Sequence, residues 1–145
     1  MTYLLDTDHF SILQRRSGPE FQNLATRMGA HTPADFALSI VTFHEQVIGA
    51  HAWIQGAKNP RQVVEGYAFL DRAFLDYGRF TVLRFDEEAL SVFSGFGGGL
   101  RVNVRDLRIA AIAIANGLIL LTRNRVHFER VPGLRFEDWA VGGEG

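Results

Sequence analysis

Short runs of hydrophobic residues alternate along the chain with longer stretches in which hydrophobic positions recur every three or four residues. The runs predict buried strands, because a strand covered on both faces reads as continuously hydrophobic. The longer stretches have the spacing of helices. The strands are expected over residues 3–5, 36–42, 80–85, 118–122 and 134–139. The alternation predicts an α/β fold with three layers, in which helices flank a mostly parallel central sheet.

Two of the expected helices have distinctive hydrophobic patterns. The helix over residues 60–77 has a narrow hydrophobic stripe, which is typical of a helical hairpin or of a contact with a partner chain. The stripe consists of Val63, Tyr67, Leu70, Phe74 and Tyr77. The helix over residues 106–116 is hydrophobic on nearly all sides, so it is expected to be buried.

The composition fits one globular domain. The 145 residues show no repeat and no linker, so residues 1–140 are expected to form a single domain and residues 141–145 a flexible tail. The absence of cysteine excludes thiol nucleophiles, disulfides and zinc–thiolate sites. The formal net charge of -1 gives the whole molecule no electrostatic footprint for nucleic acid. No stretch reads as a signal peptide or a membrane span, so a cytoplasmic protein without membrane contact is expected.

Polar residues gather at the ends of the predicted strands. Asp6 ends the first strand, and Glu45 lies just after the second. Asp106 opens the buried helix, while Thr122 and Asn124 follow the fourth strand. Ligands of open parallel sheets bind outside the carboxyl ends of the strands, where crowded carboxylates would repel one another unless a cation is bound. The sequence therefore predicts an oxygen-rich site for Mg2+ or Mn2+, able to activate water against a phosphodiester.

Each of these acids also has an ordinary structural explanation. Glu45 could close a capping box with Thr42, and Asp106 could meet the positive end of a helix dipole. Asp6 could accept backbone hydrogen bonds from its own turn. These explanations do not account for three acids at the same edge of the sheet. Asp8, by contrast, is interpreted as a simple helix cap.

Three stretches carry a further signal: YLLDTDHFSIL at the start, SIVTFHEQVIGA in the middle and RDLRIAAIAIANGLILLTRNRVHFERVPGLRFEDW at the end. Together they resemble the PIN-domain ribonucleases, and within that family the VapC-type toxins of type II toxin–antitoxin systems. In this resemblance the acidic site of the family falls on Asp6, Glu45 and Asp106. The fourth acidic position of the family is Asn124 here, and His127 stands three residues later, where an acid is frequent.

The resemblance implies a metal-dependent endoribonuclease toxin that hydrolyses RNA. It further implies an antitoxin protein that blocks the site, and a homodimer. The expected catalytic residues are Asp6, Glu45, Asp106 and Asn124. Asp6 and Asp106 would hold Mg2+, or Mn2+, directly, and Glu45 would ligate it through water or orient the attacking water.

Two alternative functions stay open on the sequence alone. One is a non-catalytic PIN-like interaction protein, whose hydrophobic stripe over residues 63–77 would bind a partner. The other is a haloacid-dehalogenase-like phosphatase with Asp6 as its nucleophile, suggested by the D-x-D pattern that Asp6 and Asp8 form. Phe10 and the isolated Lys58 do not fit the remaining motifs of that phosphatase family.

Overall fold

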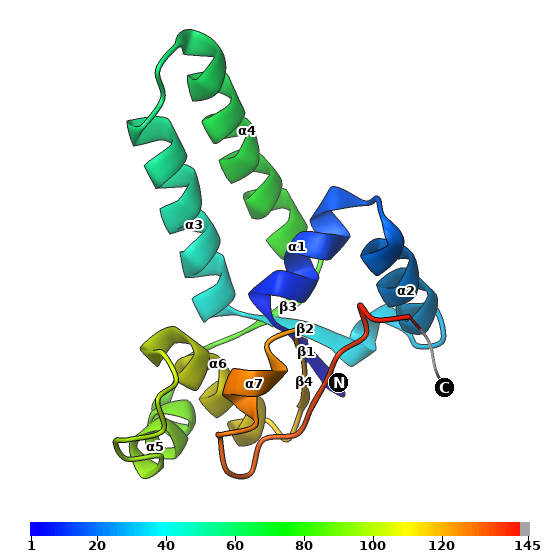
Figure 1. Ribbon diagram of the computed structural model, residues 1–145, viewed down its shortest axis with the longest axis vertical. Coiled ribbons are helices and arrows are strands. Elements are labelled where there is room, and N and C mark those ends of the chain that lie inside the picture. The colour runs from blue at the N-terminus through cyan, green and yellow to red at the C-terminus, as the bar shows by residue number, and fades with distance from the viewer. Residues whose placement is uncertain (143–145) are drawn as a thin grey trace.

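A five-stranded sheet forms the centre of the computed structural model, which describes residues 1–142 (Figure 1). The strands are β1 (Tyr3–Leu5), β2 (Phe36–Ser39), β3 (Thr81–Leu83), β4 (Ile119–Leu121) and β5 (Phe136–Glu137). Their order in the sheet is β3-β2-β1-β4-β5, and all four pairs of neighbours are parallel. The predicted α/β class is confirmed, with described strands that are all parallel.

Helices cover both faces of this sheet. They are α1 (Thr7–Arg15), α2 (Pro19–Met28), α3 (Ile40–Gln55), α4 (Pro60–Tyr77), α5 (Glu87–Gly95), α6 (Val104–Ala115) and α7 (Arg125–Phe128), with a short 3-10 helix at Pro33–Asp35. In Figure 1, α1 and α2 lie on one side of the sheet and α5 and α6 on the other. The predicted three layers are therefore present.

Two further predictions concern membrane spans and the boundary between the domain and its tail. Within residues 1–142, no helix combines the length and the hydrophobicity that a membrane span needs. Of the tail expected over residues 141–145, residues 143–145 lie outside the described part of the chain. The domain over residues 1–140 and its tail therefore stay a prediction.

Two hydrophobic clusters, one on each face of the sheet, form the core. Successive residues of a strand point to opposite faces, so each buried strand serves both clusters. Leu4 of β1 packs in one cluster with Ile109 of α6, and Leu5 packs in the other with Phe10 of α1 and Leu24 of α2. Burial on both faces explains why the strands read as continuous hydrophobic runs.

The strand order places a crevice beside β1. The chain runs from β1 to β2 and β3 on one side of the sheet, and later to β4 and β5 on the other side. β1 therefore lies at the point where the order reverses, which is where open α/β sheets bind their ligands. Asp6 follows β1 directly, and Thr122 follows the neighbouring strand β4.

Helices α3 and α4 form a hairpin that projects away from the sheet (Figure 1), and we call it the arm. The helices approach closely at Gly66, where an added Cβ would lie 2.6 Å from Cγ1 of Ile54. Gly66, Ala73 and Tyr77 are the buried residues of α4. Of the two explanations of the α4 stripe, the helical hairpin is thus present, and a glycine allows its tight packing.

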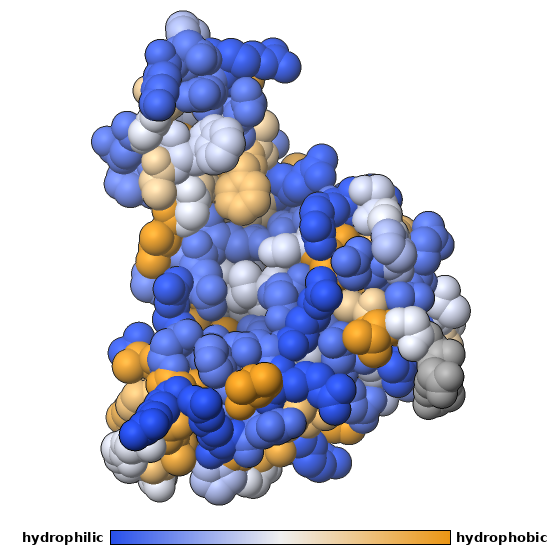
Figure 2. All heavy atoms as spheres, in the orientation of Figure 1, coloured by the Kyte–Doolittle hydropathy of each residue, from blue (hydrophilic) through white to orange (hydrophobic). Residues whose placement is uncertain are grey.

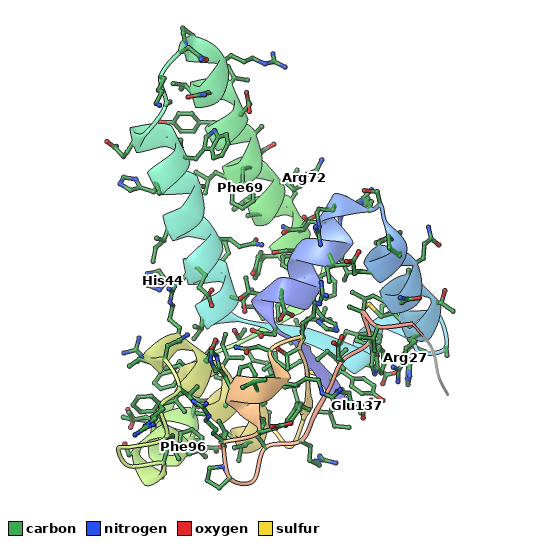
Figure 3. The ribbon with its side chains drawn as sticks, in the orientation of Figure 1. Arg27, His44, Phe69, Arg72, Phe96 and Glu137 are labelled. Atoms are coloured by element: carbon green, nitrogen blue, oxygen red, sulfur yellow. The ribbon has the colours of Figure 1, made fainter. Side chains whose placement is uncertain are left out.

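The hydrophobic stripe predicted for α4 is divided between two environments. Tyr77 is buried, whereas Val63 is 37%, Tyr67 56% and Phe74 70% exposed. Figure 3 shows Phe69 and Arg72 on the same helix and His44 at the base of α3. Only part of the stripe therefore packs inside the chain. Its other side chains leave exposed hydrophobic surface on the arm.

Two predicted helix starts differ from the structure. The strand expected over residues 36–42 ends at Ser39, because the Ser39 hydroxyl accepts the Thr42 N–H at 3.0 Å and caps α3. The capping box expected between Thr42 and Glu45 is therefore wrong. Asp6 caps α1, so the interpretation of Asp8 as the cap is also wrong. Both corrections concern side chains beside the crevice.

Candidate active site

Four segments bring the predicted site residues to the crevice beside β1. Asp6 lies between β1 and α1, Glu45 in the second turn of α3, Asp106 in the first turn of α6 and Asn124 just before α7. Figure 2 shows that the surface between the arm, α1 and α7 is hollowed and mainly hydrophilic. The structure thus brings together residues that lie far apart along the chain.

Asp6 is the most buried of these acids, with 5% of the residue exposed. One carboxylate oxygen accepts the Thr7 N–H at 2.8 Å, and the other accepts the Thr122 hydroxyl at 2.8 Å. Burial, followed by the nearby charge of Asp8, raises the pKa of Asp6 to about 8, against the lowering effect of these two hydrogen bonds. Asp6 therefore holds a proton near neutral pH unless a cation stabilises its charge.

Glu45 reaches the crevice from the base of the arm. The Thr7 hydroxyl donates to Oε1 at 3.2 Å, and Arg105 Nη1 lies 3.8 Å from Oε2. Burial raises the pKa of Glu45, and the nearby charge of Asp106 adds to the rise, although Thr7 and Arg105 oppose it. Since no capping box binds it, the Glu45 carboxylate faces the other acids instead of its own backbone.

Asp106 is held from two sides. The side-chain amides of Asn103 and Asn124 donate to its Oδ2 at 3.0 and 3.3 Å. Burial raises the pKa of Asp106, while the charges of His127 and Arg105 lower it. Within residues 1–142, no hydrogen bond uses Oδ1 of Asp106. This oxygen is therefore available to a ligand.

The donor chemistry of the site fits a hard divalent cation. Asp6, Glu45 and Asp106 supply carboxylate oxygens only, and burial raises the pKa of each, so a positive charge among them would be stabilised. In the described residues, no three acidic or histidine side chains already converge to metal-ligand distances.

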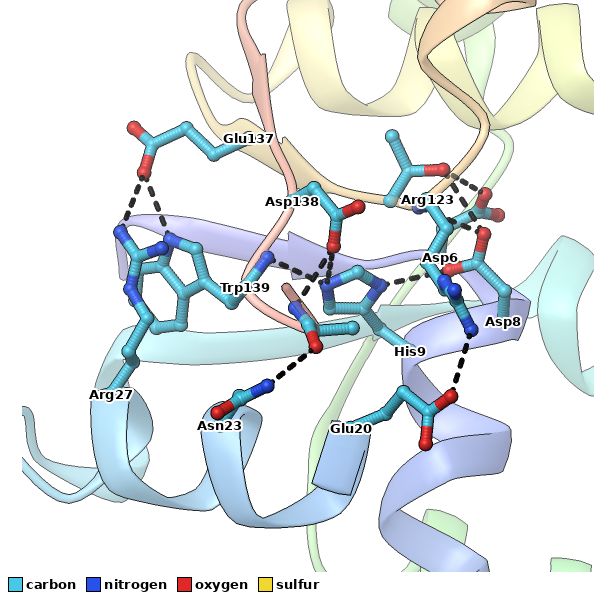
Figure 4. A network of polar contacts seen from close by, with 12 residues as sticks. Asp6, Asp8, His9, Glu20, Asn23, Arg27, Arg123, Glu137, Asp138 and Trp139 are labelled. Carbon is cyan, nitrogen blue, oxygen red and sulfur yellow. Dashed lines mark hydrogen bonds and ion pairs between the residues drawn. The ribbon is translucent and has the colours of Figure 1, made fainter. Parts of the chain in front are cut away.

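A second network links the site to the C-terminal segment (Figure 4). Oδ2 of Asp8 accepts the backbone N–H of Arg123 at 2.9 Å and the Thr122 hydroxyl at 3.3 Å. Oδ1 of Asp8 lies 2.9 Å from Nδ1 of His9, whose Nε2 accepts the Trp139 N–H at 3.1 Å. Because an amide N–H can only donate, the His9 proton is on Nδ1 and points to Asp8.

This network contains residues that sequence reasoning misassigned. His9 is fully buried, although no local pattern in the sequence indicates a partner for it. Asp8 holds the turn after β4 instead of capping α1. The signal that could have suggested the link is the FEDW stretch near the C-terminus, whose Trp139 packs beside β1 through Tyr3.

Comparisons with known proteins identify the family of this chain. Residues 3–134 match the family model of the PIN domain. The chain is 30% identical to the tRNA(fMet)-specific endonuclease VapC of Salmonella typhimurium, over 96% of this chain and 98% of that protein. It is 27% identical to ribonuclease VapC1 of Haemophilus influenzae strain R2866, over the same shares of the two chains.

Solved structures have the same fold. One chain of VapBC-1 from nontypeable Haemophilus influenzae superposes with a TM-score of 0.75 at 24% identity, covering 97% of this chain and all of that chain. One chain of DNA-bound VapBC from Salmonella typhimurium gives a TM-score of 0.69 at 26% identity, covering 96% of this chain and 98% of that chain. The chain therefore belongs to the PIN-domain family, and within it to the VapC-type proteins.

Proposed function

We propose that this protein is an endoribonuclease toxin that hydrolyses RNA with the help of Mg2+ or Mn2+. The observation that supports it best is the gathering of Asp6, Glu45 and Asp106 at the crevice beside β1, where burial raises the pKa of all three. Membership of the PIN-domain family and the ribonuclease names of the relatives agree with this proposal.

Asp6 and Asp106 would hold the cation, and Glu45 would act on the attacking water. A bound divalent cation increases the acidity of water and neutralises charge that builds up on a phosphodiester. Glu45 has a raised pKa, which suits it to orient a water molecule and accept its proton. Thr7 holds Glu45, and Asn124 holds Asp106. Asn124 is therefore a positioning residue in this mechanism.

Arginines at the rim of the crevice would bind the RNA backbone. Arg105 on α6, Arg123 in the turn after β4 and Arg125 on α7 are all exposed. Arginine pairs with phosphate in a two-pronged geometry, and such contacts position a nucleic acid without reading its sequence. A net charge near zero is thus compatible with RNA binding, because these basic side chains lie beside the site.

The proposal is tested by cleavage of a labelled initiator tRNA, the substrate that the name of one relative suggests. We expect cleavage with Mg2+ or Mn2+ and none with EDTA. The Glu45→Gln variant should lower kcat by roughly 10²-fold, because it removes a proton acceptor. Asp86→Asn is the matched control, since Asp86 caps α5 and asparagine caps equally well. Equal cleavage in EDTA and in Mn2+ would overturn the metal mechanism.

We also infer an antitoxin partner, because the similar solved structures include a toxin–antitoxin complex from Klebsiella pneumoniae. A cavity of about 550 Å3 opens between α1, α2 and the base of α4. Its apolar lining includes Phe10, Leu13, Phe21, Met28 and Phe80. Arg16, Arg72 and Arg79 line it as well, against one acid, Asp76. This composition fits a partner segment with apolar and acidic side chains.

The partner proposal predicts capture of the protein encoded beside this gene. That protein should co-purify with the chain and inhibit RNA cleavage. Met28→Glu places a charge in the apolar cavity, so it should lower the affinity for the partner by about 10-fold or more while cleavage is unchanged. Gln22→Glu adds the same charge to an exposed position of α2 and should bind normally. Equal binding by both variants would exclude this cavity.

The two alternative functions and the homodimer have less support than the ribonuclease proposal. The phosphatase alternative loses its D-x-D motif, because Asp8 binds the Arg123 backbone and His9. The exposed hydrophobic side chains of the arm, such as Trp53 and Phe74, suit either the expected homodimer or a non-catalytic partner. The homodimer stays a prediction.

A further inference from the structure

His127 is a site residue that the proposed mechanism does not use. It lies on α7, half-buried, with its Nδ1 3.0 Å from the side-chain nitrogen of Asn124. The same nitrogen donates to Oδ2 of Asp106 at 3.3 Å. The imidazole ring therefore sits one hydrogen bond away from a carboxylate of the acidic cluster.

The hydrogen bonds of Asn124 fix which nitrogen of His127 carries the proton. A side-chain amide nitrogen has two hydrogens and accepts nothing. One hydrogen goes to Asp106 and the other to Nδ1 of His127, so Nδ1 accepts. In a neutral imidazole the proton is then on Nε2. Within residues 1–142, no side chain or backbone group bonds to Nε2, which leaves an N–H donor at the edge of the site.

An N–H donor at this place complements the chemistry of the cluster. Asp6, Glu45 and Asp106 can only accept hydrogen bonds when ionised, and they repel an anionic substrate. A phosphate of RNA needs donors beside them. The guanidinium of Arg105 already lies 3.8 Å from Glu45. His127 supplies a further donor beside Asp106, held in one orientation by Asn124.

We propose that His127 binds the RNA substrate directly, its Nε2–H donating to a phosphate oxygen next to the scissile bond. The inference rests on the proposed function, because it assumes an RNA phosphodiester in the crevice. In this role His127 binds the substrate. Its hydrogen bond to Asn124 alone would only help to position Asp106. The two roles use different nitrogens of the same ring.

Two substitutions separate these roles. The amide nitrogen of glutamine lies near the position of histidine Nε2, so His127→Gln keeps the outward donor and loses the acceptor for Asn124. The amide of asparagine lies near the position of Nδ1, so His127→Asn keeps the inner contact and loses the outward donor. His127→Ala removes both. Tm and the affinity for Mn2+ are measured for all three variants, to exclude unfolding or a damaged metal site.

We expect His127→Asn and His127→Ala to raise KM for initiator tRNA by about 10-fold or more, because each loses a hydrogen bond to a charged group. His127→Gln should stay within about 3-fold of the wild type. The Kd for the same tRNA is measured in EDTA by fluorescence anisotropy, which does not depend on cleavage. The Kd values should follow the same order.

The opposite order would overturn the inference. If His127→Asn behaves as the wild type while His127→Gln is impaired, the residue only supports Asn124. Equal KM and Kd for all four proteins would also exclude substrate contact. A wild type that binds the tRNA but does not cleave it with Mg2+ or Mn2+ contradicts the proposed function, while the Kd order still decides the role of His127. A wild type that neither binds nor cleaves the tRNA contradicts both.

Discussion

The Asp6→Asn substitution is expected to reduce RNA cleavage by roughly 10³-fold or more and, at the same time, to stabilise the metal-free protein at alkaline pH. The loss of cleavage follows because the asparagine side chain carries no charge to hold the cation. The gain in stability follows because an amide in this position places no charge in the interior. The amide oxygen can accept the Thr7 N–H, and the amide nitrogen can donate to the Thr122 hydroxyl oxygen. An uncharged side chain can therefore replace both hydrogen bonds of Asp6.

The pH dependence gives the sharper test. The pKa of Asp6 rises from 3.8 in a free carboxyl to about 8 in the folded chain. Between these values the folded protein binds more protons than the unfolded chain, so its stability falls as the pH rises. Burial raises the pKa of Glu45 and Asp106 in the same direction. In EDTA, the Tm of the wild type should drop by about 5 °C or more between pH 5 and pH 8.

The Asp6→Asn variant should lose much of this pH dependence, because its largest source is removed. Added Mn2+ should restore the Tm of the wild type at pH 8, where the carboxylates are ionised, and should act little on the variant. Asp86→Asn again serves as the control, since Asp86 caps α5 outside the crevice. A wild-type Tm that rises from pH 5 to pH 8 in EDTA would contradict the buried, repelling carboxylates.

Replacement of Trp139 by alanine is expected to cost ~3–5 kcal/mol in the free energy of unfolding. Trp139 is 2% exposed, and its ring packs on Tyr3, His31 and Phe36 with centroid distances of 4.6, 5.4 and 5.9 Å. The guanidinium of Arg27 lies 4.8 Å from the ring centroid on the solvent side. Alanine would leave a cavity next to β1 that rigid aromatic neighbours cannot fill.

Urea denaturation at pH 7 measures this cost, with Trp139→Phe as the matched variant. Phenylalanine keeps most of the ring contacts and loses the hydrogen bond from the indole N–H to Glu137, which is 2.8 Å long. Its cost should be about 1–2 kcal/mol. A loss below about 1 kcal/mol for the alanine variant would mean that the segment around Trp139 contributes little to the core.

The sequence predicted those parts of the site that follow from local patterns. Asp6 ends a short hydrophobic run, and Asp106 opens a nearly apolar helix, so both could be assigned to a strand end and a helix start. The parallel sheet then implied that they meet. Glu45 and Asn124 follow the second and fourth predicted strands, which places them at the same edge, and the family resemblance matched both to its acidic positions.

The sequence failed where two local preferences compete. Residues 36–42 contain β-branched and hydrophobic residues that favour a strand, but the Ser39 hydroxyl caps α3 and the helix begins at Ile40. Asp6 and Asp8 are both good caps, and only the backbone conformation before α1 decides between them. His9 finds its partner Trp139 at a separation of 130 residues, for which no local pattern exists.

The central position of β1 has a consequence for synthesis of the protein. β1 is made first, yet its neighbour β4 and the Thr122 hydroxyl that binds Asp6 follow 116 residues later. During translation, the first half of the chain therefore contains Asp6 and Glu45 without Asp106 or the strand that completes the crevice. The site forms only after the last third of the polypeptide has left the ribosome.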